Sequence, residues 1–338
     1  MRKKYLFIFI LTTFFVLLDS SCTKDEFGSF TKEVSFDVTA RLLEGSKINC
    51  IDVDSRGNYC IGSEKELYYS INGKNETRTL DYNILDVAIA SDGTVWVGTD
   101  GGGLGHLSGN QSRWYTKANS GLPRDHIRHV EIAPDGTVWF TSCAHRLGGL
   151  GIFDGVRFEF MTPENSSLNQ NVIEDINIDR DGSVYIATSG TVGRSNIYRI
   201  KDRKLECLGD EEGMFYWIFS FTVSPSGTLY VLEDFSLSSY CCRPNNLYEF
   251  TNNRWQKINA DDIVPISFFA RIKADQRGYC WVPCYDGDTP VLYVYDGKRW
   301  IRSPKDIIPA VYITCIEVDD MNNIWLGTWS DGVFVLRQ

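Results

Sequence analysis

The sequence predicts an all-β protein, a seven-bladed β-propeller, and three observations support this prediction. A short pattern, a turn followed by an aromatic-centred strand, occurs seven times between residue 46 and the end of the 338-residue sequence. The central positions are 36 to 51 residues apart, at Cys60, Trp96, Trp139, Tyr185, Tyr230, Trp281 and Trp325. The 29 glycines and 13% aromatic residues suit a chain of many hairpins. Repeats of this length cannot bury their apolar faces alone and stack into a propeller.

Each repeat divides into four expected strands. An apolar inner strand such as 127–132 comes first, and a turn containing Asp and Gly leads to the aromatic-centred second strand. Glycine supplies the positive φ that a tight hairpin turn needs. A third strand such as 104–107 follows. The outer strand is centred on Trp114, Phe158, Leu205, Trp255 and Trp300 in five of the repeats.

The last repeat ends at Gln338 without an outer strand. Residues 33–39 alternate between apolar and polar side chains, as a strand does, yet they belong to no repeat. Phe36 precedes the inner strand of the first repeat by about the same distance as Trp114 precedes the third. We therefore expect residues 33–39 to form the outer strand of the last blade, closing the ring and removing an exposed sheet edge.

The N-terminus resembles a bacterial lipoprotein signal. Basic residues precede an apolar run from Tyr5 to Leu18, and small residues lead to Cys22. A run of 14 residues is shorter than the about 20 that a spanning helix needs. The resemblance implies a lipid on Cys22 after cleavage, although Asp19 stands where an aliphatic residue is usual. An ordinary secretory signal or an uncleaved anchor are the alternatives.

We accordingly expect a signal peptide at 1–21, a tether at 22–32 and the propeller at 33–338. The expected location is the bacterial cell envelope, most simply the outer membrane, with the propeller periplasmic or surface-exposed. The formal net charge of −10 argues against binding nucleic acid or anionic lipid surfaces, so attachment to a membrane would come from the lipid anchor alone.

Nine of the ten cysteines remain once Cys22 is assigned to lipid. Most of them occupy positions of the repeat rather than loops, and we interpret them as small apolar core residues. Cys280, Cys284 and Cys315 have a spacing that matches no familiar zinc pattern, so the sequence predicts no metal or cofactor there.

Residues 119–139 resemble the two-component-regulator propeller repeat, a family found as the periplasmic input of sensor kinases, often for glycan fragments. The resemblance rests on an Asn-Ser-Gly-Leu-Pro loop at 119–123 and an Asp-Gly turn before Trp139. Residues 92–104 and 323–334 match equally well, and the other repeats match loosely. The resemblance implies a stand-alone binding propeller, because the 338 residues contain one propeller and no transmitter.

Aligning the inner strands predicts a ring of side chains around the central channel: Cys50, Asp86, His129, Asp175, Ser220, Arg271 and Cys315. Arg128 and Glu174 come one position earlier on their strands. Carboxylates beside an imidazole can orient it, raise its pKa and make it a base or a metal ligand. Two interpretations stay open, a hydrated network that neutralises itself and a site for a small molecule or ion.

Aromatic residues at the expected loop mouths predict a sugar-stacking surface. Trp217, Phe268 and Tyr312 come before or at the start of inner strands, whereas Tyr285 and Trp329 follow second strands. Exposed rings stack on pyranose faces while polar neighbours bond the hydroxyls. The alternative is that several of these rings pack the blades together.

The sequence as a whole favours recognition without catalysis. The expected ligand is a glycan or other small molecule, or else a membrane or periplasmic protein partner, in a role linked to sensing or uptake. The alternative is a metal-dependent lyase or hydrolase similar to streptogramin lyase or gluconolactonase-like propellers. In that case His129, Glu174 and Asp175 would be catalytic, with a divalent metal in the central channel.

Overall fold

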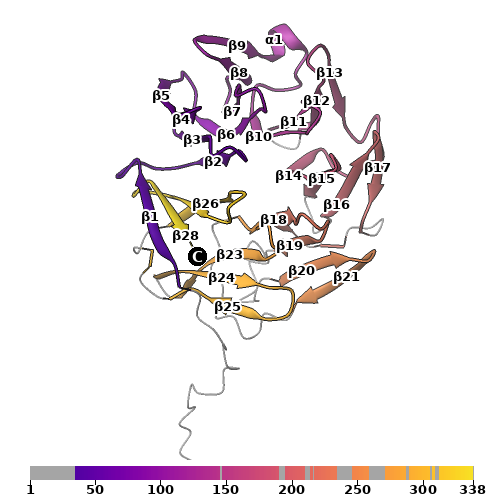
Figure 1. Ribbon diagram of the computed structural model, residues 1–338. Helices are drawn as coiled ribbons and strands as arrows, with labels where there is room; N and C mark the ends of the chain where they lie inside the picture. The colour runs from indigo at the N-terminus through magenta and orange to yellow at the C-terminus, as the bar shows by residue number, and fades with distance from the viewer. Residues whose placement is uncertain are drawn as a thin grey trace, which may run out of the picture.

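The structure is a computed structural model that describes residues 35–144, 147–189, 195–209, 214–215, 217–233, 246–258, 271–286, 289–304, 307–308 and 312–337. Within these residues the chain forms seven antiparallel four-stranded sheets, arranged as blades around a central axis (Figure 1). The predicted seven-bladed β-propeller is confirmed. The expectations for residues 1–32, including lipid on Cys22, and for Phe268 fall outside the described residues.

Each blade runs from an inner strand at the axis to an outer strand at the rim. Blade 1 contains β2 (Cys50–Val53), β3 (Tyr59–Ser63), β4 (Glu66–Ile71) and β5 (Lys74–Thr79). Blade 2 contains β6 (Ile84–Ile89), β7 (Val95–Thr99), β8 (Leu104–Ser108) and β9 (Gln111–Tyr115), followed by the short helix α1 (Lys117–Ser120). Blade 3 contains β10 (Ile127–Ile132), β11 (Val138–Ala144), β12 (Leu147–Phe153) and β13 (Phe158–Met161).

The remaining four blades repeat this order. Blade 4 contains β14 (Val172–Ile178), β15 (Val184–Ser189), β16 (Asn196–Lys201) and β17 (Lys204–Cys207). Blade 5 contains β18 (Ile218–Val223), β19 (Leu229–Glu233), β20 (Asn246–Thr251) and β21 (Arg254–Ile258). Blade 6 contains β22 (Lys273–Ala274), β23 (Cys280–Asp286), β24 (Thr289–Tyr295) and β25 (Trp300–Arg302). Blade 7 contains β26 (Ile313–Val318), β27 (Ile324–Thr328), β28 (Val333–Arg337) and, from the start of the chain, β1 (Asp37–Leu42).

In two of the repeats a hydrogen bond joins the aromatic ring to the preceding turn. The Trp281 indole donates to the Asp275 carboxylate at 3.1 Å, and the Trp325 indole donates to Asp319 at 3.2 Å. The same carboxylates accept backbone N–H groups of their turns. Turn and strand therefore stabilise each other six residues apart, and the buried ring brings its polar atom to a partner.

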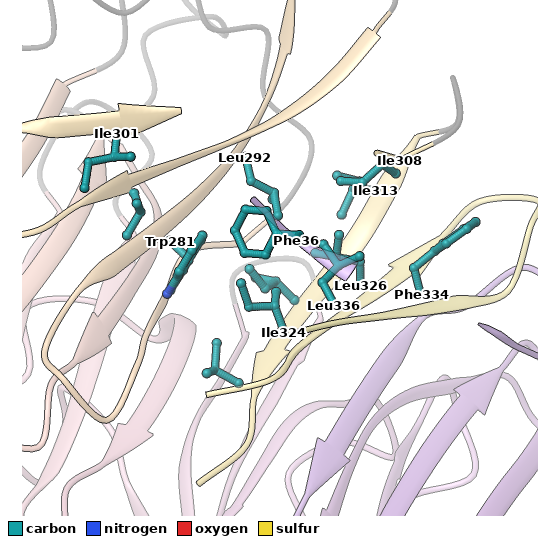
Figure 2. Packing of buried hydrophobic residues seen from close by; sticks show 13 residues of the cluster. Phe36, Trp281, Leu292, Ile301, Ile308, Ile313, Ile324, Leu326, Phe334 and Leu336 are labelled. Atoms are coloured by element: carbon teal, nitrogen blue, oxygen red, sulfur yellow. The ribbon is translucent and has the colours of Figure 1, made fainter. Parts of the chain in front are cut away.

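The hydrophobic core is divided into layers between neighbouring blades. One cluster joins Trp281 and Leu292 of blade 6 to Leu326 and Leu336 of blade 7, with Phe36 between them (Figure 2). The Phe36 ring meets the Trp281 ring edge-on, with centroids 5.6 Å apart. Because every blade buries apolar area only against its neighbours, the ring is stable only when it is closed.

The start of the chain closes the ring as expected, but the strand lies later than predicted. β1 spans Asp37–Leu42 and pairs antiparallel with β28, whereas we expected a strand at 33–39. Phe36 precedes the strand and is only 8% exposed, because its side chain packs between blades 6 and 7. Pairing therefore begins at Asp37↔Arg337, and a bulge between Val38 and Ala40 accommodates the twist.

Among the described residues, no helix is long and apolar enough to cross a membrane.

Candidate functional site

Side chains of the inner strands surround the central channel in two rings. The first ring is the predicted one, Cys50, Asp86, His129, Asp175, Ser220, Arg271 and Cys315. Alternate residues of a strand face the same side, so a second ring follows two positions later. It consists of Asp52, Ala88, Glu131, Asn177, Thr222, Lys273 and Glu317. Most members of both rings line a cavity of about 100 Å³, large enough for several water molecules.

Many ring side chains bond to the backbone of the next blade. The inner edge of each inner strand has no neighbouring strand, so its N–H groups need other partners. Side chains of the preceding blade supply four of them: Asp52 accepts from Ile89 at 2.7 Å, Asp86 from Val130 at 3.0 Å, Ser220 from Ile272 at 3.3 Å and Thr222 from Ala274 at 3.0 Å. Part of the polarity of the channel therefore stabilises the ring itself.

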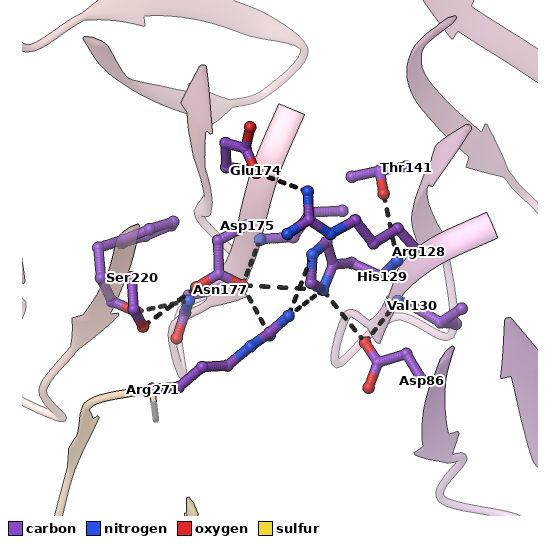
Figure 3. A network of polar contacts seen from close by, with 12 residues as sticks. Asp86, Arg128, His129, Val130, Thr141, Glu174, Asp175, Asn177, Ser220 and Arg271 are labelled. Atoms are coloured by element: carbon purple, nitrogen blue, oxygen red, sulfur yellow. Dashed lines mark hydrogen bonds and ion pairs between the residues drawn. The ribbon is translucent and has the colours of Figure 1, made fainter. Parts of the chain in front are cut away.

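Arg271 of blade 6 reaches blades 3 and 4 across the channel (Figure 3). Its guanidinium donates to Asp175 at 3.1 Å, and Nη2 lies 2.9 and 3.1 Å from the two ring nitrogens of His129. The His129 Nδ1 atom also lies 3.6 Å from Asp86 and 4.0 Å from Asp175. The structure thus brings together the four acidic or basic residues that the alignment placed in the first ring.

Burial keeps His129 neutral in this network. The side chain is 1% exposed, and burial, followed by the charge of Arg271, holds the pKa of His129 well below its ordinary value. Burial also raises the pKa of Asp86. A neutral imidazole can accept a hydrogen bond from the guanidinium, which a protonated one could not.

Arg128 and Glu174 form a separate pair above the ring, nearer the loops that precede the inner strands. Arg128 Nη1 lies 2.6 Å from a Glu174 oxygen. The Glu174 side chain is 9% exposed, whereas Arg128 is 45% exposed. This pair presents a cation to the solvent and keeps the carboxylate beneath it.

The second ring is more acidic than the first and was missed by the sequence analysis. Lys273 Nζ lies 2.7 Å from Glu317, and Asp52 and Glu131 complete a group of three carboxylates around one ammonium. Burial, followed by the charge of Glu317, raises the pKa of Asp52 to about 7, and burial raises that of Glu131 well above its ordinary value. The signal was present, because these residues follow the first ring by two positions on the same strands.

The residues proposed for metal-dependent catalysis are paired with arginine side chains. Both ring nitrogens of His129 face Arg271, and Glu174 is paired with Arg128. A cation between the imidazole and the carboxylates repels a metal ion, so the arrangement does not fit a divalent metal. Among the described residues, no group of three or more His, Cys, Asp or Glu side chains is placed to hold one.

Five cysteines in the described residues are buried and free: Cys50, Cys60, Cys280, Cys284 and Cys315. Burial raises the pKa of each of these thiols. They are packing residues, as the sequence analysis expected, since a thiol kept protonated is a poor nucleophile and a poor metal ligand.

The aromatic residues at the loops divide into exposed and buried ones. Tyr312 and Trp329 are 58% and 56% exposed, and Lys47 lies 4.0 Å from the centroid of the Trp329 ring. Tyr285 is 6% exposed, and its hydroxyl accepts the Ile313 backbone N–H at 2.5 Å, so it supports Tyr312 from beneath. Trp217 is half-buried.

Comparisons with known proteins relate the chain by fold. No protein-family profile and no curated protein matches it. A solved structure of an inactive virginiamycin B lyase from Staphylococcus aureus with quinupristin has a TM-score of 0.68 at 15% identity, covering 90% of this chain and 99% of the lyase.

Two extracellular domains from B. thetaiotaomicron are also similar. That of a putative one-component system has a TM-score of 0.62 at 19% identity, and that of a putative hybrid two-component system has 0.64 at 18%. The matches cover 90% and 89% of this chain but 40% of each extracellular domain, so the chain spans less than half their length. At these identities the likeness shows the propeller fold alone.

Proposed function

We propose that the protein is an extracytoplasmic recognition propeller, tethered to the bacterial envelope through lipid on Cys22, that binds a glycan on its loop face without chemistry. The loop face is the side of the ring where the connections between blades and the turns between second and third strands meet. The two B. thetaiotaomicron domains that share the fold are extracellular, which supports this location.

One observation carries the proposal: the charged side chains of the channel pair with one another, whereas aromatic rings are exposed on the loop face. Arg271 is hydrogen-bonded to His129 and Asp175, and the Asp86 carboxylate accepts a backbone N–H of blade 3. Tyr312 and Trp329 leave more than half of their surface exposed. Exposed aromatic faces with polar neighbours suit stacking on a sugar ring better than they suit bond cleavage.

Binding of oligosaccharides to the purified mature chain, measured by calorimetry, tests the proposal. We expect Trp329→Ala and Tyr312→Ala to weaken binding. Met321→Ala is the matched control, because Met321 is 75% exposed in the same blade but lies in the turn at the opposite end of the strands. Failure of every oligosaccharide to bind, or equal losses in the three variants, would contradict the proposal.

The tether is tested separately in cells. Metabolic labelling with an acyl-chain analogue should mark the wild-type chain and not Cys22→Ala, and the variant should leave the membrane fraction. An unlabelled wild-type chain would reject the lipid anchor while leaving recognition by the propeller open to the binding assay.

A further inference from the structure

A groove of about 640 Å³ lies between blades 1 and 2, away from the central channel. Among its lining residues are Arg78, Asp81, Tyr82, Ser112, Trp114 and Asp125. Its volume falls in the range of roughly 300–1,000 Å³ that is typical of small-molecule sites. None of these residues was singled out as a ligand-binding residue by the sequence.

The groove lies beside an outer-strand position that is small in blade 2 and large in blades 3 to 6. Ser112 pairs with Leu107, and the register-equivalent positions in blades 3 to 6 are large: Phe158, Leu205, Trp255 and Trp300. In blade 5 the Trp255 indole donates to the Leu208 carbonyl of blade 4 at 2.6 Å. Ser112 leaves the corresponding space between blades 1 and 2 open.

The aromatic ring of this outer strand lies two residues further on, at Trp114. Two residues of a strand span about 7 Å, so the ring moves along the same face towards the loop face. A β-carbon at Gly105 would lie 2.7 Å from the Trp114 ring, which shows that the indole packs directly over this glycine. Trp114 is half-buried, and it leaves part of its ring to the groove.

A second ring lies at the loop end of the groove. Tyr82 is 46% exposed, and a β-carbon at Gly102 would lie 2.4 Å from its ring. Glycines at 102 and 105 therefore allow two aromatic rings to lie close to the sheet with exposed surface.

Polar groups surround these rings. The Asp81 carboxylate, the Ser112 and Tyr82 hydroxyls and the Trp114 indole N–H make no hydrogen bond to another described residue, so they are open to the groove and its solvent. All four residues line the groove. Exposed aromatic surface combined with unpaired donors and acceptors is the chemistry that recognises a polyhydroxylated ring.

The charges of the groove define the class of sugar. Asp81 and Asp125 are carboxylates, and the Arg78 guanidinium lies 3.7 Å from Glu76 and donates to the Gly109 carbonyl. A uronic acid or a sulfated sugar would meet two like charges and one cation that is already paired. The protein as a whole carries a formal charge of −10.

We infer that the groove between blades 1 and 2 is a subsite for a neutral pyranose, stacked against Trp114 and Tyr82. This inference rests on the proposed function, because it assigns one sugar unit of the glycan to a place on the ring.

Calorimetry with neutral cello-, manno- and xylo-oligosaccharides, and with polygalacturonate oligomers as the acidic counterpart, tests the inference. Ser112→Trp fills the groove with the side chain of blades 5 and 6, and Trp114→Ala and Tyr82→Ala remove the stacking surfaces. We expect each to weaken binding of a neutral oligosaccharide by about tenfold or more.

Asn75→Trp is the matched control. Asn75 holds the position in β5 that Ser112 holds in β9, and it is exposed and does not line the groove. It should bind like the wild type, as should a Val156→Ala variant in an exposed turn of blade 3.

Each outcome separates the two proposals. Binding that is lost in Trp329→Ala but unchanged in Ser112→Trp and Trp114→Ala overturns the groove and leaves glycan recognition standing. Preference for the acidic oligomers overturns the neutral class of sugar. Absence of binding by the folded wild-type chain to every probe overturns the proposed function itself.

Discussion

Replacing Asp52 by Asn should raise the stability of the protein relative to the wild type. This gain should be larger at pH 8 than at pH 5. Asp52 faces Glu317, Glu131 and Lys273 in the second ring, and its pKa is raised from 3.8 to about 7. Between pH 3.8 and about pH 7, Asp52 therefore keeps its proton in the folded protein but has lost it in the unfolded chain. Unfolding releases that proton, so the stability of the wild type falls as the pH rises through this window.

The size of the effect follows from the shift of about three pKa units, each worth about 1.4 kcal/mol, which makes the full cost about 4 kcal/mol. Roughly 2–3 kcal/mol of it develops between pH 5 and pH 8, less what solvent screens at this partly exposed carboxyl. The amide oxygen that Asp52→Asn introduces can still accept the Ile89 N–H, which the wild-type carboxylate accepts at 2.7 Å. The gain should therefore appear without loss of the bond between blades.

Urea unfolding followed by tryptophan fluorescence at pH 5 and pH 8 measures this difference. Asp54→Asn, two residues away on the same segment, should instead lower the stability by the same amount at pH 5 and at pH 8. Burial acts to raise the pKa of Asp54, but bonds from Arg56 and Asn58 outweigh it and lower that pKa, so Asp54 is ionised and stabilises the fold equally at both pH values. Parallel stability curves for Asp52→Asn and the wild type between pH 5 and pH 8 would refute the reasoning.

Three further substitutions test the ring and its closure. Phe36→Ala should cost about 3–5 kcal/mol in urea unfolding, because it empties a buried position between blades 6 and 7, whereas Val38→Ala at an exposed position should cost under about 0.5. Gly332→Ala should lower the thermal midpoint more than Gly297→Ala, since both have positive φ but only a β-carbon at Gly332 would meet the Leu42 carbonyl, at 2.2 Å; equal losses would argue against that contact. Arg271→Met should destabilise the fold by about 2 kcal/mol by leaving Asp175 without its partner, and should raise the pKa of His129 in an NMR titration. An unchanged His129 pKa would contradict the coupling.

The number of blades could be predicted because turn and strand chemistry repeat together. In two repeats Asp275 and Asp319 accept hydrogen bonds from the indoles that mark the pattern, so there the pattern reflects a local contact. The first ring followed from the same alignment, since the inner strands share one register against the second strands. The closing strand was assigned to the right blade, because only residues near the start of the chain could supply it.

Positions that depend on contacts between segments could not be predicted. The sequence pattern places Phe36 within a strand. Its side chain instead packs in the apolar layer between blades 6 and 7, and the strand begins one residue later, at Asp37. The sequence analysis aligned Trp114 with Phe158 and Trp255, but strand pairing makes Ser112 the equivalent residue. From the sequence we expected Tyr285 to be exposed at the loops, whereas its hydroxyl accepts a backbone N–H of the next blade. Local pattern predicts the element, and packing across blades decides its register.

The charge of the channel has a structural cause, and this shifts recognition to the outside of the ring. An inner strand without an inward neighbour leaves N–H groups that water or side chains must satisfy. Asp52, Asp86, Ser220 and Thr222 satisfy four of them, and Arg271 and Lys273 offset the carboxylates of the two rings. A ligand entering the channel would have to break these bonds before forming its own. The exposed rings of Trp329, Tyr82 and the groove beside Trp114 carry no such cost, because their polar neighbours face solvent.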